Sequence, residues 1–483
     1  MHQTVREFFR PDGPTAQSTF RMKSSDTHMI ISMTCIRYLM LCTAKATSID
    51  REARGKPWTT KDFEAYAQYL NSRPFFNYAL EYAERHQQQC GQVAGDSVLI
   101  SQLHKKLNDS PAAYMLGEWI PRACGYRLLG HKQVGYSRHF RVALLHAATR
   151  MRYPQVVEAL LIAGAEVEAC LDGKTPLMVT AGGGDLATAR VLLDGGALVG
   201  ARDGSKQEAL HLAAANGHSP IVGLLIDRGA EMEAKDDKGQ TALHLAAANG
   251  HDLVVGLLID RGADKEAKEG RKQTALHLAA WNGHNPVVEQ LIDRGADKEA
   301  KDGKKQTALH FAAGKGHDHV VGQLIDRGAD KEARDEEAQT ALHHAAANGH
   351  NAVIKLLIDR GADKNTKDAL GWEVLHTAAW NNKEATIQML IKRFGTNKEG
   401  RDKCGWTALH VAAINGCDDA CQRLIGHLGA DKKVKDDIGW TPLHFVAALG
   451  LGDTAHLLIK AFDVDRGIKN SQGKTARDVA RQL

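Results

Sequence analysis

A seven-residue phrase, Thr-Ala-Leu-His-Leu-Ala-Ala at 241–247, recurs down this chain at an almost fixed spacing. The step between equivalents is 33 residues early in the chain and 34 in the last three intervals. A period of this length is typical of a solenoid, in which each unit contacts mainly its neighbours. We therefore expect function on a shared surface and not in a deep central cavity. The equivalent phrases begin at Val142, Thr175, Glu208, Thr241, Thr274, Thr307, Thr340, Glu373, Thr407, Thr441 and Thr475.

Each unit predicts two short helices and a projecting turn. The small alanines of the phrase let a first helix pack closely on the next repeat, and Gly250 then breaks it. Apolar residues between Asp252 and Asp260 predict a second helix, and Gly262 can take the left-handed conformation that ends helices. The polar stretch 263–273 is too charged for a core, so we expect it to project as a turn or hairpin. The threonine that opens the next unit is well suited to cap a helix. The fold class that follows is an all-α solenoid.

The unit resembles the ankyrin repeat, a helix-turn-helix-hairpin module. Thr441 to His444 carries Thr-Pro-Leu-His, and Gly-His at 250–251 and Gly-Ala-Asp at 262–264 follow at the family's spacing. The resemblance runs from about Arg141 to the end of the chain. It implies ten repeats over residues 142–474, a partial repeat or cap at 475–483, and a separate helical N-terminal region at 1–141.

Charge and cysteine usage narrow the classes of function. Lys plus Arg number 62 and Asp plus Glu 58, and both signs alternate along the repeats, so we expect a solvated mixed surface and no direct nucleic-acid binding. The eight cysteines form no Cys-x-x-Cys pair, which favours a reducing compartment and an intracellular protein, cytoplasmic or nuclear. We expect no signal peptide at the start, 1–13, and no membrane span, because the most apolar segment, 29–42, is too short.

The N-terminal region is helical in pattern between about His28 and Ile120. Its segments Cys35 to Leu39 and Arg73 to Leu80 are similar to the connector helices that precede the ankyrin array in fungal signalling NTPases of the NACHT class. The chain has no room for the NTPase module itself. The similarity implies a shortened relative that keeps the connector and the recognition array.

No motif predicts catalysis or a cofactor. Gly-Lys-Thr occurs at 173–175 and 473–475, but the glycine that a phosphate-binding loop needs five residues earlier is replaced by Glu168 and Ile468. His317 and His319 lack further metal ligands nearby, and so do Cys417 and Cys421. We expect no enzyme, no metal, no cofactor and no small-molecule substrate.

Histidines recur at two fixed positions of the repeat, which predicts a structural task rather than chemistry. Buried polar groups must be paired, so we expect hydrogen bonds to the backbone or to the neighbouring threonine. The first position holds His211, His244, His277, His310, His343, His376, His410 and His444. The second holds His218, His251, His284, His317 and His350.

The resemblance to ankyrin proteins implies that a partner binds on the concave side of the array, which the hairpins and the first helices form. The residue before the threonine position is glutamine in five successive units, from Gln207 to Gln339, and becomes Trp372, Trp406 and Trp440 afterwards. A second position, directly after the alanine pair, holds Trp281 and Trp380. These five tryptophans are our candidate partner-binding residues, with Trp281 and Trp380 facing the same groove. The alternative is that each ring packs on its own hairpin and shields the backbone.

The repeats between Glu208 and Asp363 are nearly copies and predict a spacer of uniform surface. A row of Lys265, Lys298, Lys331 and Lys364 predicts solubility and modest pairing between repeats. The function predicted is a non-catalytic scaffold that binds one or more proteins through the concave face. Two alternatives stay open: a transcriptional coregulator acting through a DNA-binding partner, and a truncated NTPase-type sensor.

Overall fold

The computed structural model describes residues 145–146, 148–150, 152, 154–162 and 165–481. The predicted N-terminal helical region, its resemblance to NACHT connectors and the start of the first repeat at Val142 lie outside these residues. The chain divides into two compact units, 1–204 and 205–483, and each is described by itself. None of the described helices is long and apolar enough to cross a membrane.

The described part of the first unit contains α8 (Pro154–Ile162), α9 (Pro176–Gly183) and α10 (Leu186–Asp194). Helix α10 packs against both of the others. The hydroxyl of Thr175 accepts a hydrogen bond from the backbone N–H of Met178 at 3.3 Å, which begins α9 as the sequence predicts for a threonine at this position.

The second unit, residues 205–483, is a stack of helix pairs. Successive first helices pack on one another, and so do successive second helices through most of the stack. The first helices are α11 (Ala209–Ala215), α13 (Ala242–Asn249), α15 (Ala275–Asn282), α17 (Ala308–Lys315), α19 (Ala341–Asn348), α21 (Val374–Trp380), α23 (Ala408–Ile414), α25 (Pro442–Ala448) and α27 (Ala476–Ala480). The second helices are α12 (Ser219–Asp227), α14 (Asp252–Asp260), α16 (Asn285–Asp293), α18 (Asp318–Asp326), α20 (Asn351–Asp359), α22 (Glu384–Lys392), α24 (Asp418–Gln422) and α26 (Gly452–His456).

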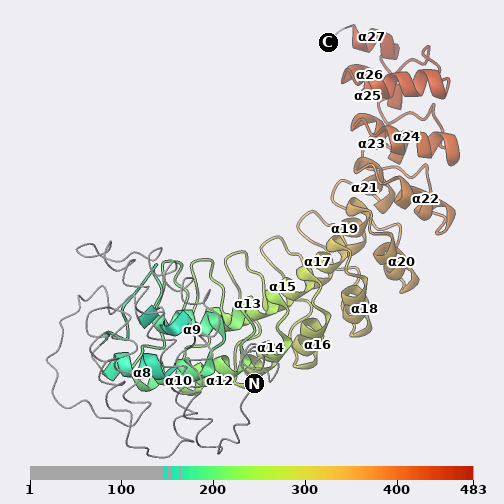
Figure 1. The fold of residues 1–483 in the computed structure, drawn as a ribbon. Coiled ribbons are helices and arrows are strands. Elements are labelled where there is room, and N and C mark those ends of the chain that lie inside the picture. The colour runs from blue at the N-terminus through green and yellow to red at the C-terminus, as the bar shows by residue number, and fades with distance from the viewer. Residues whose placement is uncertain (1–144, 147, 151, 153, 163–164, 482–483) are drawn as a thin grey trace, which may run out of the picture. The chain divides into compact units, whose positions relative to one another are not determined.

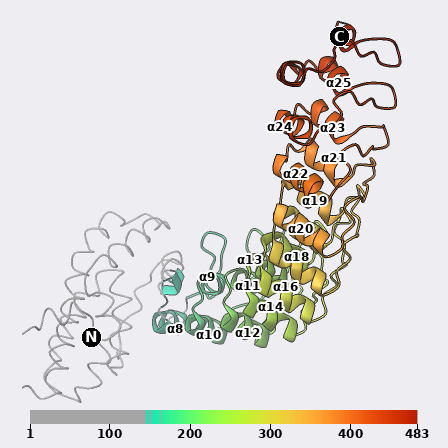
Figure 2. The same ribbon diagram turned by 90° about the vertical axis from the view of Figure 1, so that its right-hand side faces the viewer.

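The stack of the second unit is curved. In Figure 1 its first helices and hairpins follow the inner side of the bend and its second helices the outer side. Figure 2 shows the hairpins of the C-terminal repeats projecting together, away from the second helices. Among the described residues the hairpins form no named strand, and only isolated bridges such as Lys367 with Glu373 occur. The predicted all-α solenoid is confirmed.

Local chemistry explains where the helices of one unit begin and end. Thr241 has an extended backbone, with φ −91° and ψ 171°, and α13 starts directly after it. Gly250 ends that helix with φ 79°, a left-handed conformation that a glycine adopts without steric cost. The second helix predicted for 252–260 is confirmed as α14, and Gly262 follows with φ 95°.

The core runs along the stack between the two rows of helices. In one repeat Ala246, Ala247, Val254, Val255 and Leu258 are all 0% exposed, and their equivalents in the neighbouring repeats are buried in the same way. A leucine buried like Leu258 contributes about 2–5 kcal/mol relative to alanine. The small alanines allow the first helices to approach closely, as the repeating phrase predicts.

The step of 34 residues has a structural cause. The extra residue lies at the end of the second helix, where η1 (Arg423–His427) and η2 (Leu457–Ala461) are single π-helical turns that follow α24 and α26. The carbonyl ends of these helices receive lysines from the preceding hairpin: Lys398 Nζ donates to the carbonyl oxygen of Leu428 at 2.7 Å. Lys364 and Lys432 make the equivalent bonds to Phe394 and Phe462. Lys364 of the lysine row and the equivalent Lys398 and Lys432 therefore connect repeats.

The outer face of the second unit carries an arginine ladder, defined as arginines that follow a second helix and contact the aspartate at the end of the preceding one. Arg294 Nε lies 3.0 Å from Asp260 Oδ1, and Arg327 Nε lies 3.0 Å from Asp293 Oδ1. The hydrogen bond and the opposite charge lower the pKa of Asp260. The ladder pairs Arg261 with Asp227, Arg294 with Asp260, Arg327 with Asp293, Arg360 with Asp326 and Arg393 with Asp359.

Candidate interaction surface

Each hairpin from the one before α13 to the one before α25 is held by one carboxylate, and the amide oxygen of Asn470 takes this place before α27. In the hairpin before α21, Oδ1 of Asp368 accepts hydrogen bonds from the backbone N–H groups of Leu370 at 2.9 Å and Trp372 at 2.8 Å. Asp236, Asp402 and Asp436 do the same in their own hairpins. Local bonds of this kind satisfy the turn backbone and fix the direction of the residues that follow.

The same carboxylates also bind the tryptophan of the preceding hairpin. The indole N–H of Trp372 donates to Oδ2 of Asp402 at 3.1 Å, and that of Trp406 donates to Oδ2 of Asp436 at 3.2 Å. Gln306 makes a weaker version of this bond to Asp335, at 3.5 Å, in the earlier repeats. The change from glutamine to tryptophan therefore keeps one inter-repeat hydrogen bond and adds a ring.

The rings form two clusters. Trp372 packs on Trp380 with ring centroids 5.5 Å apart. Phe445 lies between the other two, 5.3 Å from Trp406 and 4.9 Å from Trp440. Trp380 is 36% exposed, and the three hairpin tryptophans are half-buried. Sequence reasoning missed Phe445, although its position, directly after the first repeated histidine, varies from Leu to Phe, His, Thr and Val along the array.

Trp281 lies apart from these clusters. Its ring is 5.5 Å from that of Phe311, the ammonium of Lys315 lies 3.8 Å from its centroid, and the side chain is 44% exposed. It lies in the last turn of α15, at the repeat position where Trp380 ends α21. No contact of the described residues joins the two, so a common groove for Trp281 and Trp380 stays a prediction.

The first repeated histidines are structural, as predicted. In His244, Nδ1 lies 3.2 Å from the backbone N and 2.8 Å from the hydroxyl of Thr241, and Nε2 lies 3.1 Å from the carbonyl oxygen of Gln273 in the next hairpin. A backbone N–H requires Nδ1 to accept and a carbonyl requires Nε2 to donate, which is the neutral tautomer. Burial lowers the pKa of His244, His277, His343, His376 and His444, and it lowers the pKa of His310 and His410 to about 4.

The second repeated histidines also bond to the backbone of a neighbouring repeat. His251 Nε2 lies 2.9 Å from the carbonyl oxygen of Ala215, and His317 Nε2 lies 3.0 Å from that of Trp281. The described residues contain no group of three or more His, Cys, Asp or Glu side chains placed to hold a metal ion. Cys417 and Cys421 are buried thiols, and burial raises the pKa of both.

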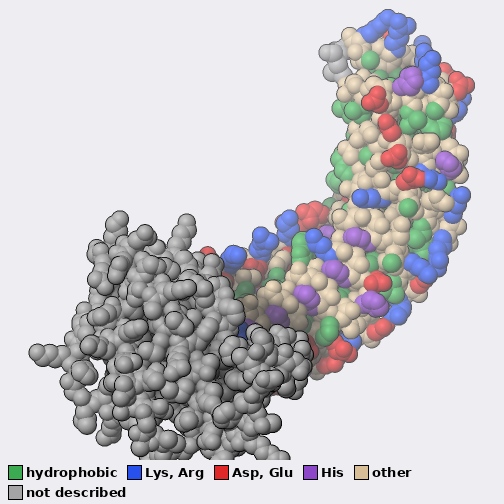
Figure 3. Space-filling model, in the orientation of Figure 1, with side chains coloured by type: hydrophobic (Ala, Val, Ile, Leu, Met, Phe, Trp, Pro, Cys, Tyr) green, Lys and Arg blue, Asp and Glu red, His purple; other side chains and the backbone are tan. Residues whose placement is uncertain are grey.

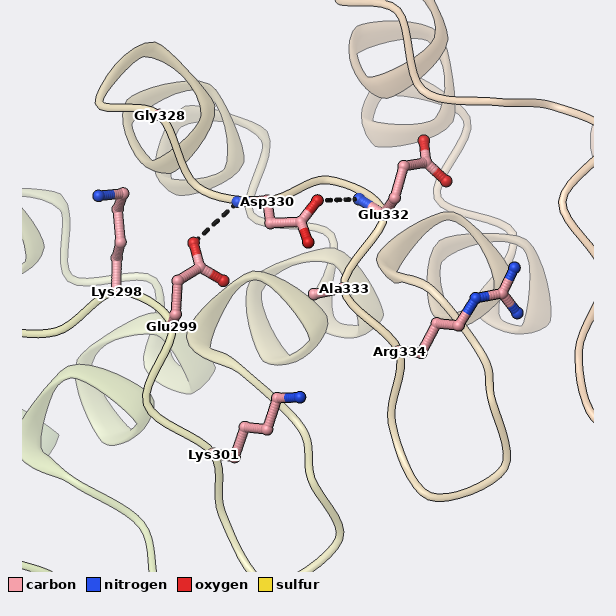
Figure 4. A pocket seen from close by; sticks show the side chains of 8 residues that line it. All are labelled: Lys298, Glu299, Lys301, Gly328, Asp330, Glu332, Ala333 and Arg334. Atoms are coloured by element: carbon pink, nitrogen blue, oxygen red, sulfur yellow. Dashed lines mark hydrogen bonds between the residues drawn. The ribbon is translucent and has the colours of Figure 1, made fainter.

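A shallow, charged hollow of about 630 Å³ lies between two hairpins of the nearly identical repeats (Figure 4). Its carboxylates are engaged with the backbone: Glu299 accepts from the N–H of Asp330 at 2.8 Å, and Asp330 accepts from that of Glu332 at 2.9 Å. Arg334 donates to the next hairpin at the carbonyl oxygen of Lys367. Lys301 lies at its rim, and no hydrogen bond joins it to the carboxylates drawn.

The hairpin tips change in character along the second unit, so the surface of the nearly identical repeats is not uniform. The tip is the residue two positions after the turn carboxylate. It is basic in the first three hairpins (Lys238, Arg271, Lys304), acidic in the fourth (Glu337), and then Leu370, Cys404 and Ile438. Leu370 and Ile438 are 60% and 58% exposed. The exposed apolar tips and the tryptophans thus occur on the same three hairpins.

These features define an ankyrin array. The family model for ankyrin repeats, in groups of three copies, matches residues 144–236, 225–302, 276–368 and 363–436. The matches together cover more than half of the chain, and the protein belongs to the ankyrin repeat family. No curated protein matches the chain. Ankyrin repeats generally mediate protein–protein interactions.

Proposed function

We propose that this chain is a protein-interaction scaffold whose C-terminal repeats anchor a partner through an aromatic surface. We define the aromatic surface as Trp372, Trp380, Trp406, Trp440 and Phe445, together with the apolar tips Leu370 and Ile438. Ankyrin repeat proteins are typically non-enzymatic, which agrees with a binding role.

The observation that carries the proposal is exposed apolar surface on successive hairpins. Leu370 and Ile438 are more than half exposed, and Trp380 leaves about a third of its surface to solvent although Trp372 packs against it. Clustered exposed hydrophobic groups mark binding sites on folded proteins, and tryptophan is enriched among the residues that dominate binding energy.

The structural role of the tryptophans does not compete with this function. The indole N–H groups of Trp372 and Trp406 bind the next hairpin and hold the rings rigidly. A rigid aromatic side chain loses little conformational entropy when a partner covers it, so the inter-repeat bonds prepare the surface for binding. Trp281, with Phe311 and Lys315, is a separate aromatic contact on the same row of first helices.

Affinity purification followed by mass spectrometry tests the proposal, with the full-length chain as bait in cells of its native organism. Trp380→Ala changes an exposed ring that donates no hydrogen bond to another hairpin. Leu253→Ala is the matched control, because Leu253 is 71% exposed on the second helix α14. We expect Trp380→Ala to lose a partner that Leu253→Ala and the wild type retain, with equal helical circular dichroism. Equal partner sets for all three would contradict the proposal.

The partner's identity then separates the scaffold from a transcriptional coregulator, which would capture a DNA-binding protein. We place the protein inside the cell, where exposed thiols such as Cys404 stay reduced.

A further inference from the structure

The hairpins between residues 205 and 305 carry a basic edge, which consists of nine exposed lysine and arginine side chains on neighbouring hairpins. They are Lys206, Lys235, Lys238, Lys268, Arg271, Lys272, Lys301, Lys304 and Lys305. In the space-filling view, blue side chains gather along the hairpin side of the array and red ones follow them (Figure 3). The edge ends at the next hairpin, where Glu336 and Glu337 are exposed.

Most of the carboxylates near the basic edge are already engaged, whereas Asp237, on the first of these hairpins, is exposed. Asp302 Oδ1 accepts hydrogen bonds from the backbone N–H groups of Lys304 and Gln306, both at 2.8 Å, and Glu269 Oε1 accepts from those of Arg271 and Gln273. At the base of the hairpins, glutamates accept from the backbone of the following repeat, as Glu266 does from Asp297.

The cations of the basic edge have no such partners among the described residues. No ion pair joins any of the nine to a described carboxylate, whereas all five arginines of the outer ladder are paired with aspartate. Lys235 and Lys268 donate only to backbone carbonyl oxygens, those of Lys268 and Lys301. Positive charge is therefore concentrated on one edge of the array and balanced on the opposite face.

Three of these lysines have a left-handed backbone. Lys206, Lys272 and Lys305 have φ angles of 59°, 63° and 60°, in the region that disfavours side chains, whereas the equivalent Gly239 and Gly439 adopt 78° and 76°. A lysine at this position makes the turn less stable than glycine would.

We propose that the basic edge binds an acidic segment of a partner protein, at a surface separate from the aromatic one. This inference rests on the proposed scaffold function and adds a second region with its own partner chemistry. Unpaired cations on neighbouring hairpins complement a segment of consecutive aspartates and glutamates.

The observations favour protein over nucleic acid. Eight of the nine cations are lysines, and the hairpin segments 235–239, 268–272 and 301–305 contain no aromatic residue on which a base could stack.

Fluorescence anisotropy tests the inference on the full-length chain. The probe is a short labelled peptide of alternating aspartate and glutamate, and the comparison probe is a single-stranded oligonucleotide of equal formal charge. Lys272→Glu with Lys305→Glu is expected to weaken peptide binding by at least about tenfold, because two attractions become repulsions. The matched control, Lys355→Glu with Lys460→Glu, makes the same net charge change at exposed sites and is expected to change binding less than about twofold.

A second pair of variants separates binding from folding. Lys272→Gly with Lys305→Gly is expected to raise the urea midpoint of unfolding while it weakens peptide binding. Trp380→Ala is expected to leave peptide binding unchanged. The proposal for the aromatic surface and the proposal for the basic edge are therefore tested independently. Four results would each overturn the inference. Peptide binding could be unchanged in the Lys272 and Lys305 variants, or the charge control could lose as much binding as they do. The glycine variant could have a lower urea midpoint, or the oligonucleotide could bind more tightly than the peptide.

Discussion

Protonation of the buried histidines should make the stability of the array depend on pH in a defined window, and His410 isolates the effect. Its ring is 0% exposed, Nδ1 accepts from the N–H of Thr407 at 3.1 Å, and Nε2 lies 3.1 Å from the carbonyl oxygen of Trp440. Burial is the largest cause that lowers its pKa to about 4, against the hydrogen bond to Trp440 and the nearby carboxylates of Asp436 and Asp402, which raise it.

The sign and magnitude follow from proton linkage. The unfolded histidine, with a pKa near 6.5, binds a proton as the pH falls, and the folded ring does not until about pH 4. Neutral His410 therefore contributes fully to the free energy of unfolding above about pH 6.5, and this contribution declines as the pH falls from there to about 4. Between pH 7.5 and 5.5 one such site accounts for about 1.4 kcal/mol of lost stability. Aspartates whose pKa is lowered, such as Asp335, change the free energy of unfolding only at pH values below this window.

Urea unfolding followed by helical circular dichroism checks the reasoning at pH 7.5 and 5.5. His410→Gln removes the titrating group and is expected to be less stable than the wild type at pH 7.5. The gap in the free energy of unfolding should narrow by about 1.4 kcal/mol at pH 5.5, because the variant no longer loses stability at this site. A gap that stays constant or widens as the pH falls would refute the assignment of a neutral, acid-sensitive histidine.

Three further changes have expected outcomes in the same urea assay at neutral pH. Replacing Lys272 or Lys305 with glycine should stabilise the protein by about 1 kcal/mol each, because a left-handed backbone favours glycine; no gain would mean that the turn is unstrained. Trp372→Phe keeps an aromatic ring but removes the hydrogen bond to Asp402, so a loss of about 1–2 kcal/mol is expected, and an unchanged midpoint would show that this bond contributes nothing. Arg327→Ala should cost less than about 1 kcal/mol, since its pairs are solvent-exposed; a larger loss would mean that the outer ladder acts as a cooperative network.

The repeat period predicts the fold because each local signal agrees with the others. The buried alanines, the left-handed Gly250 and the second helix at 252–260 all lie where the sequence places them, and the bonds of His244 to the backbone and to Thr241 follow from the rule that buried polar groups are paired.

The interaction surface was less predictable, because its contacts join residues about 30 positions apart. The indole N–H bond from Trp372 to Asp402 and the position of Phe445 between two tryptophans depend on how one hairpin lies against the next. The sequence shows a row of tryptophans, but it does not show which atoms of each ring contact the next hairpin. Similarly, a count of charged residues shows nearly equal numbers of positive and negative side chains. Only the structure distinguishes the arginines that are paired with aspartate from the lysines that are not.

The arginine ladder on the outer face allows the number of repeats to change during evolution. Each arginine meets the aspartate one unit before it, so loss of one 33-residue unit would bring Arg327 to Asp260 in place of Asp293. An equivalent arginine–aspartate pair would replace the pair that such a deletion removes. Arrays of different length can therefore arise by duplication or deletion of single units, without compensating substitutions in this ladder.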